Sequence, residues 1–485
     1  MSRTERDALG ELEVDSNAYY GIFTQRAKAN FQISGITAKA SFLKALATIK
    51  KAAALTNMKL GLLDSKTGSA IAESADELLS GKHNEQFPLD VFQAGAGTPF
   101  NMNMNEVIAN LATEKLGGRK GQYIVHPNDH VNMSQSTNDV VPTATRIAAL
   151  MELEGLISEL GRLGRAFSTL AEKHKDTLKV ARTHLQDAVP ITFGQVFSSY
   201  ATSISKCIKR INNAKEELQE LGIGGTAAGT GLNAHPEFKR LIVSELQKET
   251  GMPLSAAADT VETTWSHSAF LNFSSCLRTL AVELAKICDD LMILNSGPKA
   301  GIGELVLPEV EPGSSIMPGK VNPSIPECMK MICFQVIGND AAVMESAKAG
   351  SLELNVNTPL IMHNILLSIE LLTNGARMFR TLCVEGLKAD TEAATRLFEN
   401  SHVLATALNP YLGYDIVAAL VKTALQEKKT IKEAILEKQL MTKEDVDRIL
   451  EPRRTTQPGT VDKELAEKIK ASEPFLRFKE TLRTG

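Results

Sequence analysis

The sequence has few aromatic residues and no long hydrophobic run, and both shortages narrow the classes of protein that it can encode. Aromatic residues make up 5% of the 485 residues, although hydrophobic residues reach 43%. The core must therefore be aliphatic and rich in alanine. That composition suits packed helices better than a β-sandwich, which favours aromatic and β-branched residues. No run of about 18 uninterrupted apolar residues is present, so we expect no membrane span.

Signals for disulfides, metals and secretion are also missing. The six cysteines form no CxxC pair and lie mostly in apolar runs, which is typical of reduced thiols in a cytosolic protein. No HExxH motif is present, so the sequence predicts neither a metal site nor a cofactor. The stretch from Met1 to Asp7 is charged and lacks an apolar segment. We therefore expect no secretory signal and a cytoplasmic location.

The charge is nearly balanced, with a formal net charge of −4. No basic block suggests a nucleic-acid partner or an anionic membrane. The balanced charge also gives no general electrostatic attraction for an acidic ligand, so any carboxylate has to be bound by local groups. A glycine-rich segment, residues 222–231, resembles a nucleotide loop only weakly, because no strand precedes it and no Gly-Lys-Ser/Thr ends it. We interpret it as a helix break with close backbone packing.

Long helical patterns fill most of the chain. Apolar residues recur at steps of three and four from Ile147 to Leu170, which predicts a helix that follows Pro142 and ends near His174. The same pattern predicts four more long helices, located from near Pro190 to before Gly222, from Ala257 to Asn295, from near Pro326, and after Pro359. Helices of this length with wide apolar faces have to pack as a bundle. The pattern alone leaves a monomeric bundle open.

We therefore predict an all-α fold with three regions. Residues 1–139 form a smaller, mostly helical N-terminal domain. Residues 140–391 form a central domain built as a long-helix bundle, and residues 392–485 form a small helical C-terminal domain. The tail after Pro452 is charged and is interpreted as a solvated helix.

The most informative segment is Gly313–Pro323, whose sequence is GSSIMPGKVNP. Pro318 and the glycines disfavour a regular helix, so the polar groups of this loop can face a ligand. Lys320 can hold a carboxylate as a point charge, and Asn322 can donate hydrogen bonds to it. Ser314 can ionise if backbone N–H groups and a cation stabilise its alkoxide. Taken alone, such a cluster is more often a surface turn.

Three further segments place small polar residues at turns or helix starts. Residues 95–98 (GAGT) form a small-residue turn that lets a ligand approach the backbone. Residues 135–139 (QSTND) offer two hydroxyls and an amide in a row, which reach one ligand together only from a turn or a helix start. Residues 182–190 (RTHLQDAVP) are expected just before a helix that starts with proline. Each segment by itself would more often be structural, as a cap, a turn or a packed histidine.

Together and in this order, the four segments resemble the aspartase/fumarase superfamily, whose members remove a group beta to a carboxylate and release fumarate. The likeness runs from about Ala18 to about Tyr414, nearly the whole chain. It implies a small-molecule dicarboxylate or amino-acid substrate. It also implies a homotetramer with a shared helical core, in which segments of three subunits meet at each active site.

The resemblance also implies a role for each matching residue. Ser314 is expected to be the general base that takes the Cβ proton, and Glu327 is expected to orient His184. The residues expected to act in catalysis are Ser314, His184 and Lys320. The residues expected to bind the substrate are Thr98, Ser136, Thr137, Asn138, Thr183, Lys320 and Asn322.

The choice of leaving group rests on small differences within these motifs. Fumarases usually have GSGT, QSSN and two additional threonines where this chain has GAGT, QSTN, Leu185 and Val189. Fewer hydroxyls fit a site that binds an ammonium group, so the expected reaction is the reversible deamination of L-aspartate to fumarate and ammonia through an enediolate. Residues 126–130 (HPNDH) instead resemble a second, non-catalytic dicarboxylate site of fumarases. Dehydration of malate, as in a class II fumarase, is therefore the alternative.

Two other possibilities follow from the same motifs. Asn357-Thr358 matches neither enzyme at a position where the two differ, which leaves a modified amino acid open as the substrate. A non-catalytic structural relative is the remaining class. The presence of Ser314, Lys320 and Thr183 favours an active enzyme.

Overall fold

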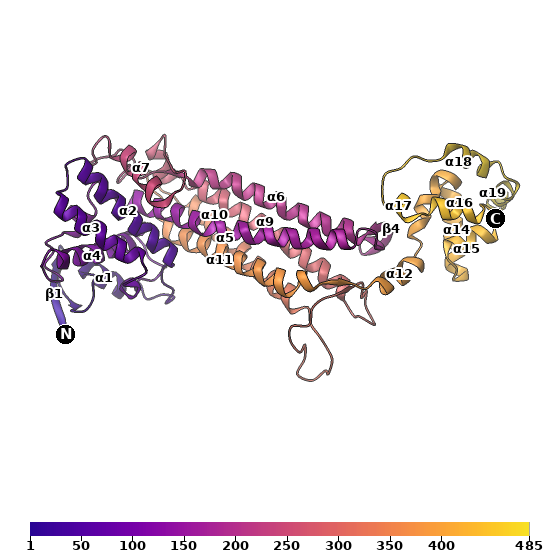
Figure 1. The fold of residues 1–485 in the computed structure, drawn as a ribbon, viewed down its shortest axis with the longest axis horizontal. Helices are drawn as coiled ribbons and strands as arrows, with labels where there is room; N and C mark the ends of the chain where they lie inside the picture. The colour runs from indigo at the N-terminus through magenta and orange to yellow at the C-terminus, as the bar shows by residue number, and fades with distance from the viewer. Residues whose placement is uncertain (485) are drawn as a thin grey trace. The chain divides into compact units, whose positions relative to one another are not determined.

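The computed structural model describes residues 1–484, and helices dominate it (Figure 1). Within these residues the strands pair only in twos, as four small sheets. They are β1 Ser2–Asp7 with β2 Gly10–Asp15, β3 Leu178–Thr183 with β4 Gln186–Thr192, β5 Glu220–Leu221 with β6 Ser255–Ala256, and β7 Leu305–Val306 with β8 Lys388–Ala389. The predicted all-α fold is confirmed.

Five long helices occupy the middle of the chain: α5 Thr137–Lys173, α6 Phe193–Leu218, α9 Ser268–Asn295, α10 Ser324–Lys348 and α11 Thr358–Leu382. Three of the predicted boundaries are wrong. Helix α5 includes Pro142 instead of following it, because the cap at Ser136 starts the helix six residues before that proline. Helix α6 begins at Phe193, because Pro190 lies in strand β4.

The predicted helix from Ala257 to Asn295 is two helices, α8 Thr260–Trp265 and α9. Ser266 separates them in an extended conformation, with ψ of 126°. The ring of the buried His267 stabilises this break, because Nδ1 lies 3.0 Å from the Ser266 carbonyl and Nε2 lies 3.1 Å from Thr358 Oγ1.

The chain folds as two compact units, and unit 1 comprises residues 1–160, 206–285 and 329–376. Its shorter elements are α1 Ile22–Asn30, α2 Ala40–Lys59, α3 Ser65–Leu79, η1 Asn84–Gln86, α4 Thr98–Lys115, η2 Pro127–Val131 and α7 Phe238–Thr250. Buried polar pairs join the long helices inside this unit. Ser274 of α9 donates to Asp340 of α10 at 2.7 Å, and Asn339 of α10 donates to Ser368 of α11 at 3.0 Å.

Unit 2 comprises residues 161–205, 286–328 and 377 onwards. Its shorter helices are η3 Val384–Gly386, α12 Thr391–Glu399, η4 Val403–Leu408, α13 Asn409–Leu412, α14 Tyr414–Glu427, α15 Ile431–Glu437, α16 Lys443–Ile449, α17 Pro452–Thr455, α18 Lys463–Lys470 and α19 Glu473–Thr484. The C-terminal helices share an apolar core that includes Leu420, Ile435 and Val446. Leu465 and Ile469 of α18 are buried in it, so the charged tail is an amphipathic helix packed on one face.

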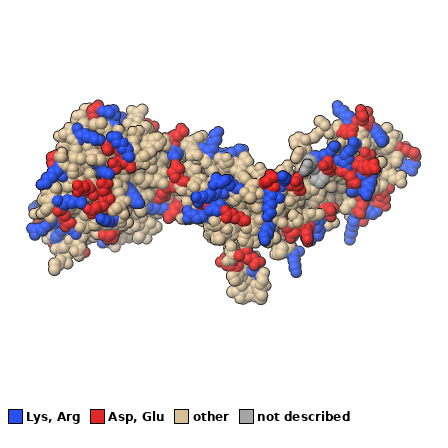
Figure 2. Space-filling model, viewed as in Figure 1, with Lys and Arg blue, Asp and Glu red and all other residues tan. Residues whose placement is uncertain are grey.

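The surface and the thiols agree with the composition. All six cysteines are free. Among residues 1–484, no helix combines the length and the apolar character that crossing a membrane requires. Basic and acidic side chains are interspersed over the face shown in Figure 2. On this face, attraction for a carboxylate therefore has to come from particular side chains.

Candidate active site

Ser314 lies in unit 2, on the long loop between β7 and α10. Its Oγ accepts hydrogen bonds from the backbone N–H groups of Ile316, at 3.1 Å, and Met317, at 3.0 Å. Two N–H dipoles aimed at one oxygen favour the ionised form of that oxygen. The turn therefore supplies the backbone donors that a serine alkoxide requires.

The Ser314 loop is closed on itself. The N–H of Gly313 donates to the Lys320 carbonyl at 2.8 Å, and the Asn322 side chain donates to the Gly313 carbonyl at 2.8 Å. A Cβ at position 313 would lie 2.5 Å from the Lys320 carbonyl oxygen, so only glycine fits. Ser314, Lys320 and Asn322 therefore lie on one closed loop without regular structure, as the sequence predicts. The Lys320 side chain is exposed.

Thr183 and His184 lie at the tip of the β3–β4 hairpin in unit 2. Thr183 pairs with Gln186, and the two residues between them, His184 and Leu185, have φ of 57° and 60°. Two consecutive positive φ angles define a type I′ turn, which non-glycine residues adopt only at some cost in energy. The prediction that a Pro-started helix follows directly is wrong, because strand β4 intervenes. The turn leaves Thr183 and His184 exposed.

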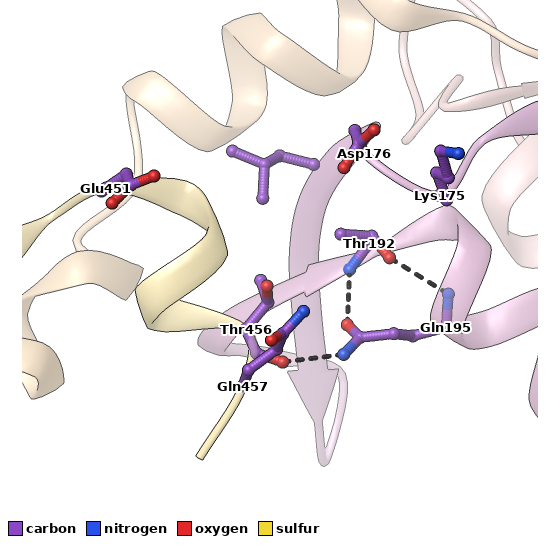
Figure 3. A pocket seen from close by; sticks show the side chains of 8 residues that line it. Lys175, Asp176, Thr192, Gln195, Glu451, Thr456 and Gln457 are labelled. Carbon is purple, nitrogen blue, oxygen red and sulfur yellow. Dashed lines mark hydrogen bonds between the residues drawn. The ribbon is translucent and has the colours of Figure 1, made fainter. Parts of the chain in front are cut away.

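A buried ion pair fixes the base of this hairpin. Arg182 Nη1 lies 2.8 Å from Glu304 Oε2, and the Glu304 side chain is fully buried. Lys179 lies 3.7 Å from the same oxygen. At the other strand, the Gln195 side chain accepts from the Thr192 N–H at 3.0 Å and donates to the Thr456 carbonyl at 2.7 Å (Figure 3). The hairpin is therefore held at both strands.

Thr98 lies in unit 1 at the first residue of α4. The three preceding residues, Gly95, Ala96 and Gly97, all have positive φ, of 82°, 55° and 85°. The Thr98 hydroxyl donates to the Gly95 carbonyl at 2.7 Å. This arrangement confirms the predicted small-residue turn, and it leaves the lone pairs of the Thr98 oxygen to accept from a ligand.

Ser136, Thr137 and Asn138 form the start of α5, in unit 1. The Ser136 oxygen accepts from the Asn138 N–H at 3.3 Å, while the Asp139 carboxylate accepts from the Ser136 N–H at 3.0 Å. These two bonds form a helix cap. The three residues therefore share one turn, with backbone N–H groups beside them, as the sequence predicts. The cap and a role in binding are compatible, because the cap orders the turn.

Asp139 also ties this turn to the glycine-rich segment. Its Oδ2 accepts from the N–H groups of Gly224, at 3.0 Å, and Thr226, at 2.9 Å. A Cβ at Gly229 would lie 2.3 Å from the Cα of Val261, which confirms close backbone packing in residues 222–231. Burial raises the pKa of Asp139 to about 6, although these backbone donors favour the charged form.

Lys50 of α2 is a buried cation that the sequence analysis missed. Its side chain is fully buried. Its Nζ donates to the amide oxygens of Asn101 at 2.7 Å, Asn132 at 3.0 Å and Gln135 at 2.9 Å. Burial lowers the pKa of Lys50 to about 7, and the charge of Asp139 opposes that shift. One signal was available: Lys50 lies four residues after Leu46 and three before Ala53, on the apolar face of its helix.

The predicted residues thus fall into clusters in both units. Thr98 and residues 136–138 belong to unit 1, whereas residues 183, 184, 314, 320, 322 and 327 belong to unit 2. Glu327 lies in the first turn of α10 with its side chain exposed. Among residues 1–484, no group of three or more His, Cys, Asp or Glu side chains is arranged to hold a metal ion.

A separate hollow of about 470 Å³ lies in unit 2 between the β3–β4 hairpin and α17 (Figure 3). Its lining residues are Lys175, Asp176, Leu178, Thr192, Gln195, Glu451, Thr456 and Gln457. None of the predicted site residues lines it.

Comparison with known proteins matches this chain almost from end to end. A family model described as lyase matches residues 10–338, and one described as fumarase C C-terminus matches residues 404–457. An aspartate ammonia-lyase of Helicobacter pylori is 44% identical over 95% of this chain and 99% of that protein. A class II fumarate hydratase of Nitrosomonas europaea is 46% identical over 94% of this chain and 99% of that protein.

Solved structures show the same fold. A crystal structure titled as a fumarate lyase:delta crystallin from Brucella melitensis has a TM-score of 0.92 and 44% sequence identity. The match covers 94% of this chain and all of that one.

Proposed function

Because this chain belongs to the aspartase/fumarase superfamily of lyases, we propose that it is an ammonia-lyase that converts L-aspartate reversibly to fumarate and ammonia. The observation that carries the proposal is the turn at Ser314, whose oxygen accepts two backbone N–H bonds. A full-length relative named aspartate ammonia-lyase supports the choice of substrate.

The reaction begins at a carbon whose proton is only weakly acidic. The Ser314 alkoxide takes the Cβ proton, and the C–H electrons move into the adjacent carboxylate to form an enediolate. Lys320 and Asn322, on the same closed loop, stabilise the added charge, and Thr183 and Ser136 add donors. The enediolate electrons then form the C=C bond. The C–N bond breaks, and ammonia leaves with the bonding pair while Ser314 holds the proton.

The Thr98 turn favours a substrate with an ammonium group. The Thr98 hydroxyl proton is committed to the Gly95 carbonyl, so its oxygen faces a ligand as an acceptor. An ammonium group supplies the donor that such an oxygen needs. Thr137, Asn138 and His184 complete the surroundings of the second carboxylate and the leaving group, and Glu327 orients His184.

We propose that the enzyme is a homotetramer whose helical core joins segments of different subunits into each active site. Apolar side chains on two long helices support this assembly, because such side chains are costly to leave in water. Val282 of α9 is 51% exposed, while Met331 and Phe334 of α10 are 65% and 57% exposed. The boundaries 1–139, 140–391 and 392–485 are proposed as the domains of each subunit.

A class II fumarase is the second candidate, and two observations favour it. The fumarate hydratase relative is as similar as the aspartate ammonia-lyases, at 46% identity. Residues 126–130 also have the fumarase-like sequence HPNDH. For either activity we propose a cytoplasmic location, because four of the six free thiols are buried in the reduced form: Cys207, Cys288, Cys333 and Cys383.

The two candidates are separated by one assay. Purified protein is mixed with L-aspartate or with L-malate, and the absorbance of fumarate is followed. We expect fumarate from aspartate. Fumarate from malate alone would exclude the ammonia-lyase proposal and establish the fumarase. Fumarate from neither would favour a modified substrate or a non-catalytic relative.

A further inference from the structure

In unit 1, the side chain of Lys50 and the three amide side chains around it place a charge in an unusual environment. Lys50 is fully buried, and its three hydrogen bonds end on neutral amide oxygens. Only the ammonium form has three N–H donors, so this geometry fits a charged side chain. A buried ammonium without a carboxylate in contact is expensive, and an apolar residue of similar size would be cheaper for stability alone. Stability alone therefore does not explain why a lysine occupies this position.

Lys50 fixes the direction of one amide. Because the Lys50 N–H groups need an acceptor, the oxygen of Asn101 faces Lys50 and its NH₂ group faces the other way. That NH₂ group donates to Thr137 Oγ1 at 3.2 Å and to Asn132 Oδ1 at 3.1 Å. Turning the Asn101 amide over would bring its N–H groups against those of Lys50. Asn101 is thus held as a donor toward Thr137.

The direction of the Asn101 amide decides what the Thr137 hydroxyl can do. An oxygen that accepts from Asn101 keeps its own proton for another partner. Thr137 is only 8% exposed and lies at the first residue of α5, between Ser136 and Asn138. Within residues 1–484, its hydroxyl has no hydrogen-bond partner other than Asn101. The hydroxyl proton is therefore available to a ligand at this helix start.

We propose that Lys50 is a positioning residue that, through Asn101, makes the Thr137 hydroxyl a hydrogen-bond donor to a substrate carboxylate. This inference rests on the proposed function, because that function places Thr137 in the binding site. Lys50 does not touch the substrate and takes no part in proton transfer. Its role is to keep one donor of the site correctly directed before the substrate arrives.

The decisive variant is Asn101→Asp, which keeps the shape of the side chain. An aspartate gives Lys50 a carboxylate partner, so we expect the thermal unfolding midpoint not to fall. The same carboxylate cannot donate to Thr137, so the Thr137 proton turns toward it and away from the substrate. KM for aspartate should rise about 10-fold or more, the loss expected for one hydrogen bond to a charged group. The change in kcat should be smaller.

Two double variants test whether the effect passes through Thr137. Lys50→Gln keeps hydrogen-bond donors for some of the surrounding amide oxygens, but it leaves the Asn101 amide able to turn over. The KM of this variant for aspartate should therefore rise as well. Combined with Thr137→Val, neither Asn101→Asp nor Lys50→Gln should raise KM beyond the value for Thr137→Val alone. Lys51→Met is the matched control, because Lys51 of the same helix pairs instead with Asp76 at 2.9 Å and Glu249 at 2.7 Å. It should leave KM unchanged.

The outcomes separate this inference from the proposed function. If the wild type is active and Asn101→Asp has an unchanged KM, or if the double variants are additive, the inference is overturned and the proposed function stands. If the wild type acts on malate, KM for malate is measured instead. If it acts on neither substrate, calorimetric affinity for fumarate replaces KM. A wild type that neither turns over nor binds these dicarboxylates overturns both.

Discussion

The guanidinium of Arg182 lies 2.8 Å from the fully buried carboxylate of Glu304. This pair connects the strand that carries Thr183 and His184 to the segment that leads into the Ser314 loop. Two groups of predicted site residues in unit 2 are thus joined by one buried ion pair. The positions of the exposed residues depend on it.

Replacing Glu304 with glutamine should destabilise unit 2 and reduce turnover. The change removes the buried counter-charge of Arg182 and Lys179 and leaves Arg182 only the exposed Asp187, at 4.0 Å. Breaking a buried pair costs about 3–5 kcal/mol. Differential scanning calorimetry and steady-state kinetics measure the two effects. The control is Glu172→Gln, because Glu172 and Lys175 form a pair with side chains 75% and 61% exposed, worth about 0–1 kcal/mol. Equal unfolding midpoints for the two variants would contradict this account.

Adding one methyl group to Gly313 should abolish most of the activity and leave the helical content unchanged. The new Cβ would lie 2.5 Å from the Lys320 carbonyl oxygen and 2.8 Å from the Asn322 nitrogen, so the loop has to open. Gly319→Ala is the matched control in the same loop. Nothing lies within 4 Å of its Cβ position, although its φ of 78° adds strain of about 1–2 kcal/mol. Kinetics and circular dichroism compare the two variants, and equal loss of activity would show that closure is irrelevant.

His267 should make the protein less stable as the pH falls from 6.5 toward 4. Burial lowers the pKa of this histidine from 6.5 to about 4. In the unfolded chain His267 therefore binds a proton below pH 6.5, whereas in the folded chain it binds one only near pH 4. The stabilisation is complete above pH 6.5 and is lost through that window; the shift corresponds to about 3 kcal/mol.

Thermal unfolding midpoints of the wild type and of His267→Gln, recorded between pH 7 and 4, isolate this contribution. The variant should lose less stability on acidification than the wild type. His235 is exposed, so His235→Gln should follow the wild type. Parallel curves for the wild type and His267→Gln would show that this ring does not cause the acid sensitivity.

The sequence predicted the parts of the fold that depend on composition and periodicity. The apolar steps from Ile147 to Leu170 identified α5, and the Gly and Pro residues of 313–323 identified the loop. The type I′ turn at His184 and Leu185 was missed, because neither residue is the glycine or asparagine that usually marks such a turn. The break at Ser266 was missed because it rests on a contact between His267 and Thr358, which are far apart in the chain.

In the candidate site too, the sequence predicted local features but not contacts between residues far apart in the chain. Local clusters such as residues 136–138 could be found from their spacing, since a cap is a local structure. Lys50 could not be interpreted, because its partners Asn101, Asn132 and Gln135 come from other elements. A lysine on an apolar helix face is normally explained by its stem reaching water. Only the folded chain shows that this one is enclosed by amide oxygens.

The most direct test of the account is the turnover of L-aspartate by Ser314→Ala, compared with Ser315→Ala and the wild type. Removing the general base should lower kcat by about 10²–10⁴-fold, with the oligomeric state by analytical ultracentrifugation unchanged. Ser315→Ala, which alters the neighbouring exposed hydroxyl, should retain turnover. A Ser314→Ala enzyme that assembles normally and releases fumarate at the wild-type rate would contradict the assignment of this serine as the base.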